Sequence, residues 1–151
     1  MQHPWFYKNK EIHAIEDLPD HDNIYGFVYL IQDSITYKFY VGKKVLRNVR
    51  KTKISQRLKK ATKTRKTYQR TVKESDWKDY YGSCKELQDD IKKYDKQRFK
   101  RTILELCCTK KYLSFCEIKW QIKLEVLNGG SYNGNILGRY YIRDMQNCFK
   151  P

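Results

Sequence analysis

The chain has 151 residues, of which 40% are hydrophobic and 15% aromatic, and its formal net charge at pH 7 is +15. This length predicts one domain, and the aromatic content excludes a disordered chain, since disordered segments contain few aromatic residues. No apolar run is long enough to span a membrane, and the N-terminus lacks the apolar stretch of a signal peptide. We therefore expect a cytoplasmic protein that does not associate with membranes.

The five cysteines are spaced too irregularly to predict a metal site or a disulfide framework. Their number is odd, no two form a C-x-x-C pair, and the three histidines all lie far upstream. This pattern is typical of free thiols in a reducing compartment and argues against structural zinc. The cysteines are Cys84, Cys107, Cys108, Cys116 and Cys148.

The chain begins with a polar segment of mixed charge, residues 1–24, which predicts an extended arm with little regular structure. Two segments rich in β-branched and aromatic side chains follow, at 26–32 and 37–42. The residues between them, 33–36, have the composition of a turn. Together these segments predict a β-hairpin.

Two tyrosines are expected to meet across this hairpin. A turn centred on Ser34 and Ile35 places Tyr29 directly opposite Tyr40 in the antiparallel register. Side chains of directly opposed residues lie close together on one face of a sheet. We therefore expect the two phenol rings to share a face.

Most of the excess positive charge lies in one segment, residues 43–73, which has 14 Lys or Arg and no Asp or Glu. A block of this density repels itself and is best explained by a polyphosphate partner, with nucleic acid the leading candidate. A solvated loop without a partner is the alternative, and the apolar stripe is too thin for membrane insertion. The segment also contains a short helical pattern near 54–61. The residues expected to contact nucleic acid are Lys43, Lys44, Arg47, Arg50, Lys51, Lys53, Arg57, Lys59 and Lys60.

Beyond the basic segment, the sequence predicts two helices with a strand between them. A capping box at Ser83–Glu86, with Ser83 as N-cap, begins a helix over about 84–95. Residues 99–107 are apolar and β-branched and predict a strand that returns to the sheet. Residues 111–128 have helical periodicity and are closed by a pair of glycines. These elements predict an α+β fold with a small three-stranded, mainly antiparallel sheet flanked by helices.

Glu117 interrupts the apolar face of the second predicted helix, between Leu113 and Trp120. A buried carboxylate is costly unless it is paired or binds a cation, which makes Glu117 a functional candidate. The alternative is a glutamate at the edge of the stripe that reaches solvent or pairs with a lysine. The sequence alone leaves both interpretations open.

Phe27-Val28-Tyr29 and Tyr40-Val41-Gly42, ten residues apart, resemble the two-part signature of the GIY-YIG nuclease family. In that family the two tyrosines lie on neighbouring strands of a hairpin. The helix with Glu117 resembles the family's metal-binding glutamate helix, and Tyr132-Asn133 resembles the Tyr-Asn that ends the core.

The likeness covers residues 25–136 and leaves 137–151 as a C-terminal tail. The stretch Trp77–Ser83, with Lys43-Lys44, is similar to a phage-encoded branch of the family. Three departures are evident: the first triplet retains only its tyrosine, the histidine that some members carry before the second helix is missing, and the basic segment is longer than the usual connection. Tyr80, Tyr81 or Lys78 are the candidates to replace that histidine.

The resemblance implies a divalent-metal-dependent endonuclease that hydrolyses phosphodiester bonds of double-stranded DNA with Mg²⁺ or Mn²⁺ and no small-molecule cofactor. Glu117 would hold the metal, Tyr29 would activate or orient the water with help from a cation that lowers its pKa, and Tyr40 would orient a water or a phosphate oxygen. An arginine would hold the scissile phosphate, with Arg50 the best match and Arg47 and Arg57 as alternatives. Asn133, or Asn135 in its place, would support the metal site or the fold. The implied catalytic residues are thus Tyr29, Tyr40, Arg50, Glu117 and Asn133.

A homing endonuclease, encoded by a phage or mobile element and acting in the host cell, is one role for such an enzyme. The alternative function is a non-catalytic basic nucleic-acid-binding protein that retains the fold. Because only a short tail follows the core, target specificity should be low or should come from the basic segment, from homodimerisation, or from a partner.

Overall fold

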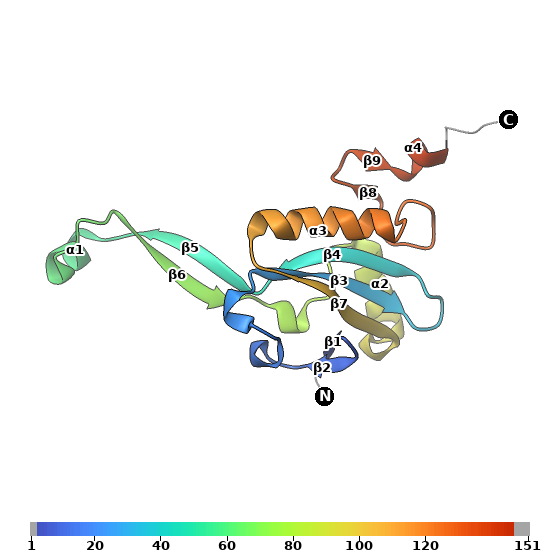
Figure 1. Ribbon diagram of the computed structural model, residues 1–151, viewed down its shortest axis with the longest axis horizontal. Helices are drawn as coiled ribbons and strands as arrows, with labels where there is room; N and C mark the ends of the chain where they lie inside the picture. Colours follow the sequence, from blue (N-terminus) through green and yellow to red (C-terminus); the bar gives the residue numbers. More distant parts are fainter. Residues whose placement is uncertain (1–2, 147–151) are drawn as a thin grey trace.

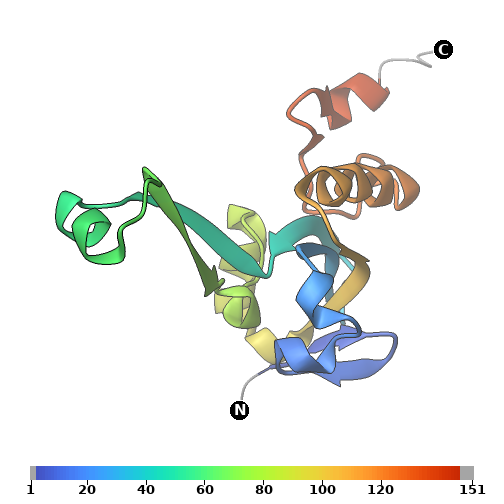
Figure 2. The same cartoon turned by 60° about the vertical axis from the view of Figure 1, so that its left-hand side comes forward.

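The computed structural model describes residues 3–146, which form a mixed sheet with helices on both faces and a long hairpin that projects from it (Figures 1 and 2). The strand order of the sheet is β2-β1-β7-β3-β4. Its three main strands are β3 (Gly26–Asp33), β4 (Phe39–Val45) and β7 (Phe99–Cys107), as expected. The predicted α+β class is confirmed, but the sheet has five strands rather than three.

The two additional strands come from the N-terminal segment, β1 (Trp5–Tyr7) and β2 (Lys10–Ile12). β1 pairs in parallel with β7, and Trp5 lies beside Arg101. The 3₁₀ turns η1 (Ile15–Asp17) and η2 (His21–Asn23) follow. The expectation of little regular structure here was wrong, because apolar side chains scattered through this polar segment are buried in the main core. They are Trp5, Ile12, Ile15, Leu18 and Ile24.

The predicted register of the β3–β4 hairpin was also wrong, by two residues. Tyr29 lies opposite Gly42, and Tyr40 lies opposite Ile31. The turn is longer than expected because the Asp33 backbone N–H donates to the Lys38 carbonyl at 2.9 Å, which closes a loop over residues 34–37. A slip of two residues keeps each side chain on its face, since side chains alternate with a period of two. The two phenol rings therefore still share a face, with centroids 6.1 Å apart.

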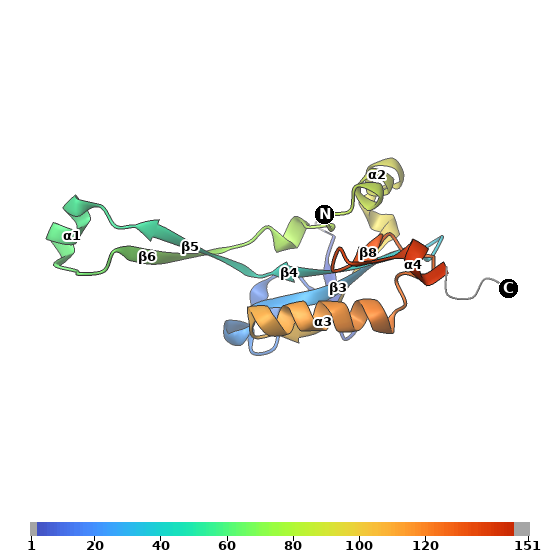
Figure 3. The same ribbon diagram turned by 90° about the horizontal axis from the view of Figure 1, so that it is seen from above.

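Helices cover the sheet on opposite sides, α2 (Lys85–Tyr94) on one and α3 (Lys110–Lys123) on the other (Figure 3). The turn η3 (Trp77–Asp79) packs on the α2 side, and η4 (Lys96–Arg98) leads into β7. β3 is buried on both faces, which explains its nearly continuous apolar sequence. Beyond α3 lie β8 (Asn135–Ile136), β9 (Tyr140–Tyr141) and α4 (Ile142–Gln146).

The ends of the helices differ from the expected ones. The N-cap of α2 is Cys84, and the hydroxyl of Ser83, the expected cap, instead lies 3.3 Å from the hydroxyl of Tyr40. α3 ends at Lys123, before the glycine pair, because Glu125 already adopts a left-handed conformation with φ of 51°. The apolar residues after this point belong to a loop that packs onto the core.

The basic segment forms most of a projecting arm, which consists of β5 (Arg47–Lys53), α1 (Gln56–Thr62) and β6 (Tyr68–Glu74) (Figure 1). The short helix α1 was expected, whereas the two strands were not. Leu46, at the base of the arm, is buried, and its backbone bonds to Tyr25 at 3.0 Å and to Ser75 at 2.8 Å. These bonds fasten the arm to the edge of the sheet.

In the part of the chain that the structure describes, no helix is long and apolar enough to cross a membrane. Cys84, Cys107, Cys108 and Cys116 are free thiols, as expected, and Cys148 lies outside the described residues.

Candidate active site

A polar cavity of about 480 Å³ opens where α3 and the loop after it meet the edge strand β4. Tyr40 and Lys43 come from β4, Glu117 and Gln121 from α3, and Asn133 from the loop. The cavity therefore gathers three of the five catalytic candidates named from the sequence. The complete lining is Tyr40, Lys43, Cys84, Glu117, Ile118, Gln121, Tyr132, Asn133, Gly134, Asn135, Leu137 and Gly138.

Glu117 projects from the edge of the apolar face of α3, and its side chain is 22% exposed. Its Oε2 lies 3.0 Å from Nζ of Lys43, which also donates to Oγ of Ser114 at 3.1 Å. Of the two interpretations left open by the sequence, the lysine pair at the edge of the stripe is the one observed. The carboxylate nevertheless borders the cavity and can be reached from solvent.

Tyr29 is buried beneath the edge strand, with only 1% of its surface exposed. Its hydroxyl lies against Gly42, where a Cβ would approach the phenolic oxygen to 2.5 Å. The glycine of the Tyr-Val-Gly triplet therefore makes room for the tyrosine of the other triplet. Burial raises the pKa of Tyr29 well above its ordinary value. The surrounding protein groups therefore do not lower this pKa in the way expected of a nearby cation.

Tyr40 lies between Tyr29 and the cavity and is partly exposed. Its hydroxyl is within 3.3 Å of the Ser83 hydroxyl, and burial raises its pKa also. Both phenols are therefore neutral at physiological pH and can donate or accept hydrogen bonds.

Tyr80, one of the candidates to replace the missing histidine, lies on the same face as the tyrosine pair. Its ring centroid is 5.9 Å from that of Tyr29, and Nζ of Lys44 lies 3.8 Å from the Tyr80 centroid. Lys44 also bonds to Asp76 at 2.6 Å. The buried Arg101 donates to the Tyr80 carbonyl at 3.0 Å and so holds this segment against the sheet.

Asn133 uses its side-chain amide to bind the backbone of β4. Its Oδ1 accepts from the Val41 N–H at 2.9 Å, and its Nδ2 donates to the Val41 carbonyl at 2.8 Å. Gln121, which sequence analysis missed, donates to the same carbonyl at 3.2 Å. Both polar groups of Asn133 are thus committed to the fold beside the cavity, whereas Asn135 lies at its exposed rim.

The three candidate arginines lie outside the cavity lining and on the arm. Arg50 is exposed on β5, and Arg57 is exposed on α1 near the tip. Arg47, at the base, donates to the His21 carbonyl at 3.2 Å. The structure therefore does not bring an arginine to Tyr40 and Glu117, and Lys43 is the cation that lies there.

Among the described residues, no cluster of three His, Cys, Asp or Glu side chains could hold a metal ion. A single accessible carboxylate nevertheless fits Mg²⁺, which keeps several waters and binds one or two carboxylates together with substrate phosphates. The oxygen of Glu117 at the cavity edge is such a donor. For Glu117 to coordinate a metal ion, Lys43 must release the carboxylate or share it with the ion.

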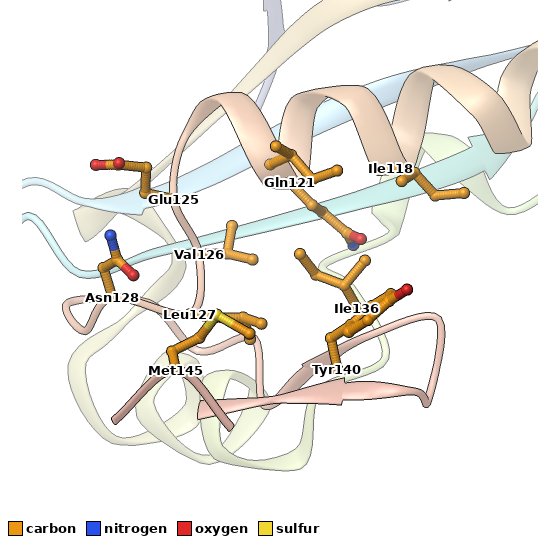
Figure 4. Close-up of a pocket in the computed structure, with 10 residues that line it drawn as sticks. Ile118, Gln121, Glu125, Val126, Leu127, Asn128, Ile136, Tyr140 and Met145 are labelled. Atoms are coloured by element: carbon orange, nitrogen blue, oxygen red, sulfur yellow. The ribbon is translucent and has the colours of Figure 1, made fainter. Parts of the chain in front are cut away.

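A second cavity, of about 380 Å³ and mainly apolar, lies between the C-terminal half of α3 and the segment that contains β8, β9 and α4 (Figure 4). Gln121 borders both cavities. Glu125 and Asn128 lie at one end, the Tyr140 phenol lies beside Ile136 at the other, and Val126 and Leu127 lie between them (Figure 4). The lining includes the Glu125 carboxylate and the Tyr140 phenol but no Lys or Arg, so it lacks the cation that stands beside the carboxylate in the polar cavity.

The mixed sheet, the pair of tyrosines and the glutamate helix define the class as a GIY-YIG nuclease domain. A family model described as "Putative endonuclease segE, GIY-YIG domain" matches residues 5–142. The chain belongs to this family, and it is an endonuclease that hydrolyses phosphodiester bonds. The resemblance stated from the sequence is thereby confirmed. No curated protein and no solved structure matched the chain.

Proposed function

We propose that the protein cuts double-stranded DNA in a reaction that requires a divalent cation, Mg²⁺ or Mn²⁺. The observation that carries this proposal is the meeting of Tyr40, Lys43 and Glu117 at one open polar cavity, next to the root of a strongly basic arm. The cavity supplies groups for chemistry on a phosphate, and the arm supplies the charge that a DNA backbone attracts.

Phosphodiester hydrolysis needs an oriented water, neutralisation of the charge that develops on the phosphate, and stabilisation of the leaving oxygen. Glu117 would hold the cation, which supplies Lewis-acid stabilisation when bound. Lys43 would move from Glu117 to a phosphate oxygen of the substrate, since its Nζ already lies at the cavity. Its flexible stem makes such a movement inexpensive.

Tyr40 would orient the attacking water or a phosphate oxygen through its neutral hydroxyl. Tyr29, which lies beneath the edge strand, would help to orient the water through the hydroxyl that lies against Gly42. Asn133 would keep β4 and the loop in register, so that Tyr40 and Lys43 point into the cavity. A homing role would further require recognition of a defined target, for which the arm is the best-placed part of the described chain.

The test is cleavage of supercoiled plasmid with Mg²⁺, with EDTA, and with the Glu117→Gln and Tyr29→Phe variants. We expect nicking and linearisation that depend on Mg²⁺ and fall at least 100-fold in Glu117→Gln, while the gel shift of DNA persists. Tyr29→Phe should lower cleavage far more than binding, because only the hydroxyl is lost. Metal-independent cutting, or undiminished cutting by Glu117→Gln, would contradict the proposal. Shifted but uncut DNA under every condition would favour a non-catalytic binder.

A further inference from the structure

We propose that one face of the β5–β6 ribbon reads base pairs in the major groove of the DNA, so that the arm determines where the enzyme cuts. The inference rests on the proposed function, in that the substrate is duplex DNA. It goes further by assigning sequence recognition to particular side chains. Charge attracts the arm to any phosphate backbone, whereas recognition depends on which side chains meet the base edges.

The register of the ribbon sorts its side chains into two faces. Asn48 pairs with Lys73, Arg50 with Thr71, and Thr52 with Gln69. Side chains alternate along each strand, so these three pairs share one face. This reading face consists of Asn48, Arg50, Thr52, Gln69, Thr71 and Lys73. The opposite face consists of Arg47, Val49, Lys51, Lys53, Tyr68, Arg70, Val72 and Glu74.

The two faces differ in chemistry. Every side chain of the reading face ends in a hydrogen-bonding group of a kind that recognises bases: Arg and Lys bind guanine, Asn and Gln bind adenine, and Thr bonds to either. The opposite face places Val49 and Val72 side by side, 56% and 59% exposed, next to cations that suit phosphate contacts. Five of the six side chains of the reading face also line a concavity of about 790 Å³ on the arm.

The dimensions favour the major groove of a B-form duplex over other nucleic acids. A two-stranded ribbon with strands about 4.8 Å apart fits a groove about 12 Å wide. The major groove of A-form RNA is too narrow for such readout. Single strands are bound by stacking on aromatic rings, and the reading face contains none.

The acidic residues at the root of the concavity do not oppose this placement. Glu74 accepts from the Trp77 indole at 2.8 Å and pairs with Lys78 at 3.4 Å, and Asp76 bonds to Lys44 at 2.6 Å. Each carboxylate therefore has a cationic partner within the protein. From β5 through the tip to β6, by contrast, every charged side chain before Glu74 is basic.

The connection between the arm and the sheet limits the distance between the recognised bases and the cleaved bond. Seven residues separate Lys43 at the cavity from Arg50 on the reading face, so their Cα atoms are at most about 25 Å apart. Buried Leu46 and its two backbone bonds hold this connection. At about 3.4 Å per base pair, the cut should fall within roughly one helical turn of the recognised bases.

The experiment is cleavage of linear duplexes that contain a randomised segment, with Mg²⁺ and limiting enzyme, followed by sequencing of the cut ends. Arg50→Ala and Arg70→Ala form a matched pair, since each removes one exposed arginine from the ribbon, on the reading face and on the opposite face respectively. Both lie outside the core, so melting temperatures equal to that of the wild type will show that both variants fold normally.

We expect the wild type to prefer certain bases at a constant offset from the cut. Arg50→Ala should lose roughly 5- to 150-fold discrimination at one position, the value of a bidentate base contact. Arg70→Ala should keep the same base preference but bind DNA more weakly. The slope of log affinity against log salt concentration should be smaller in magnitude by about one. Cutting without any base preference, or a preference changed by Arg70→Ala and not by Arg50→Ala, would overturn the inference.

Selection of bound duplexes from the same library in EDTA separates this inference from the proposed nuclease chemistry. A preference recovered there and altered by Arg50→Ala would support the reading face even if no cleavage is detected. Cleavage with random ends, combined with random selected duplexes, would leave the nuclease standing and refute the reading face.

Discussion

Replacing Gly42 by alanine should destabilise the protein and impair cleavage, although the same change is ordinarily favourable within a strand. A glycine in a strand interior is less favourable than alanine by roughly 0.5–1 kcal/mol, because it loses more backbone freedom on folding. At Gly42 we expect the opposite, that alanine is less favourable than glycine, because of what surrounds this position. An added Cβ would lie 2.5 Å from the Tyr29 hydroxyl and 2.8 Å from its Cζ.

The size of the effect follows from how tightly Tyr29 is held. Non-bonded heavy atoms ordinarily lie about 3.5–4.0 Å apart, so the ring or the strand must move by about 1 Å. Tyr29 is fully buried, with the rings of Trp5 and Tyr80 at 5.5 and 5.9 Å. Overpacking of such a site costs about 1–3 kcal/mol. Because Tyr29 is proposed above to take part in cleavage, a displacement of about 1 Å should also lower the rate, by about 100-fold.

Chemical denaturation and plasmid nicking measure the two consequences separately. Gly134→Ala is the matched control for stability, because nothing lies within 4 Å of its Cβ position, and it should change the unfolding free energy by less than about 0.5 kcal/mol. In a Tyr29→Phe background the closest contact is gone, so the cost of Gly42→Ala should shrink by about 0.5 kcal/mol or more. A variant as stable and active as wild type, or an equal cost in both backgrounds, would refute this reasoning.

Two further predictions concern stability. Asn133→Ala should lower the unfolding free energy by about 1–3 kcal/mol in denaturant titrations, because it leaves the Val41 N–H unpaired while Gln121 still binds the Val41 carbonyl; no loss would mean that water replaces the amide. Burial alone would raise the pKa of Glu105, but bonds from Lys119, Trp120 and Tyr112 hold it at about 2, below its ordinary value of 4.5. The folded-state pKa is depressed, so this stabilisation, roughly 3 kcal/mol at most, is present above pH 4.5 and is lost as the pH falls toward 2. Denaturant titrations at pH 6 and pH 2.5 should therefore differ less for Glu105→Gln than for wild type, and an equal difference would contradict the assignment.

Much of the core was predictable because its side chains follow the periodicity of their elements. The β-branched and aromatic runs around Tyr29 and Tyr40 predicted the hairpin. The strand predicted at 99–107 has the same bounds as β7. The register failed because the hydrogen bonds of the Asp33 side chain and backbone select a longer turn than composition indicates. The shared face survived because the error was an even number of residues.

Features that depend on distant partners were not predictable. β1 forms because Trp5 packs on Phe27 and pairs with a strand almost a hundred residues away, and nothing local in the polar N-terminal segment indicates this. The strands of the arm have little apolar alternation, since both of their faces meet solvent. At the cavity, Glu117 was identifiable because it interrupts an apolar stripe, whereas its partner Lys43 was one of many lysines in a basic segment.

The pairing of β1 with β7 has a consequence for the order of events during synthesis. Trp5 leaves the ribosome early, but its neighbour Arg101 is made about two thirds of the way along the chain, and Asn133 is made later still. Contacts between residues so far apart in sequence form slowly, because a long loop must close first. The basic arm is therefore translated well before Glu117 and Asn133 complete the cavity. The arm proposed to bind DNA is thus complete in the nascent chain before the cavity proposed to cut it.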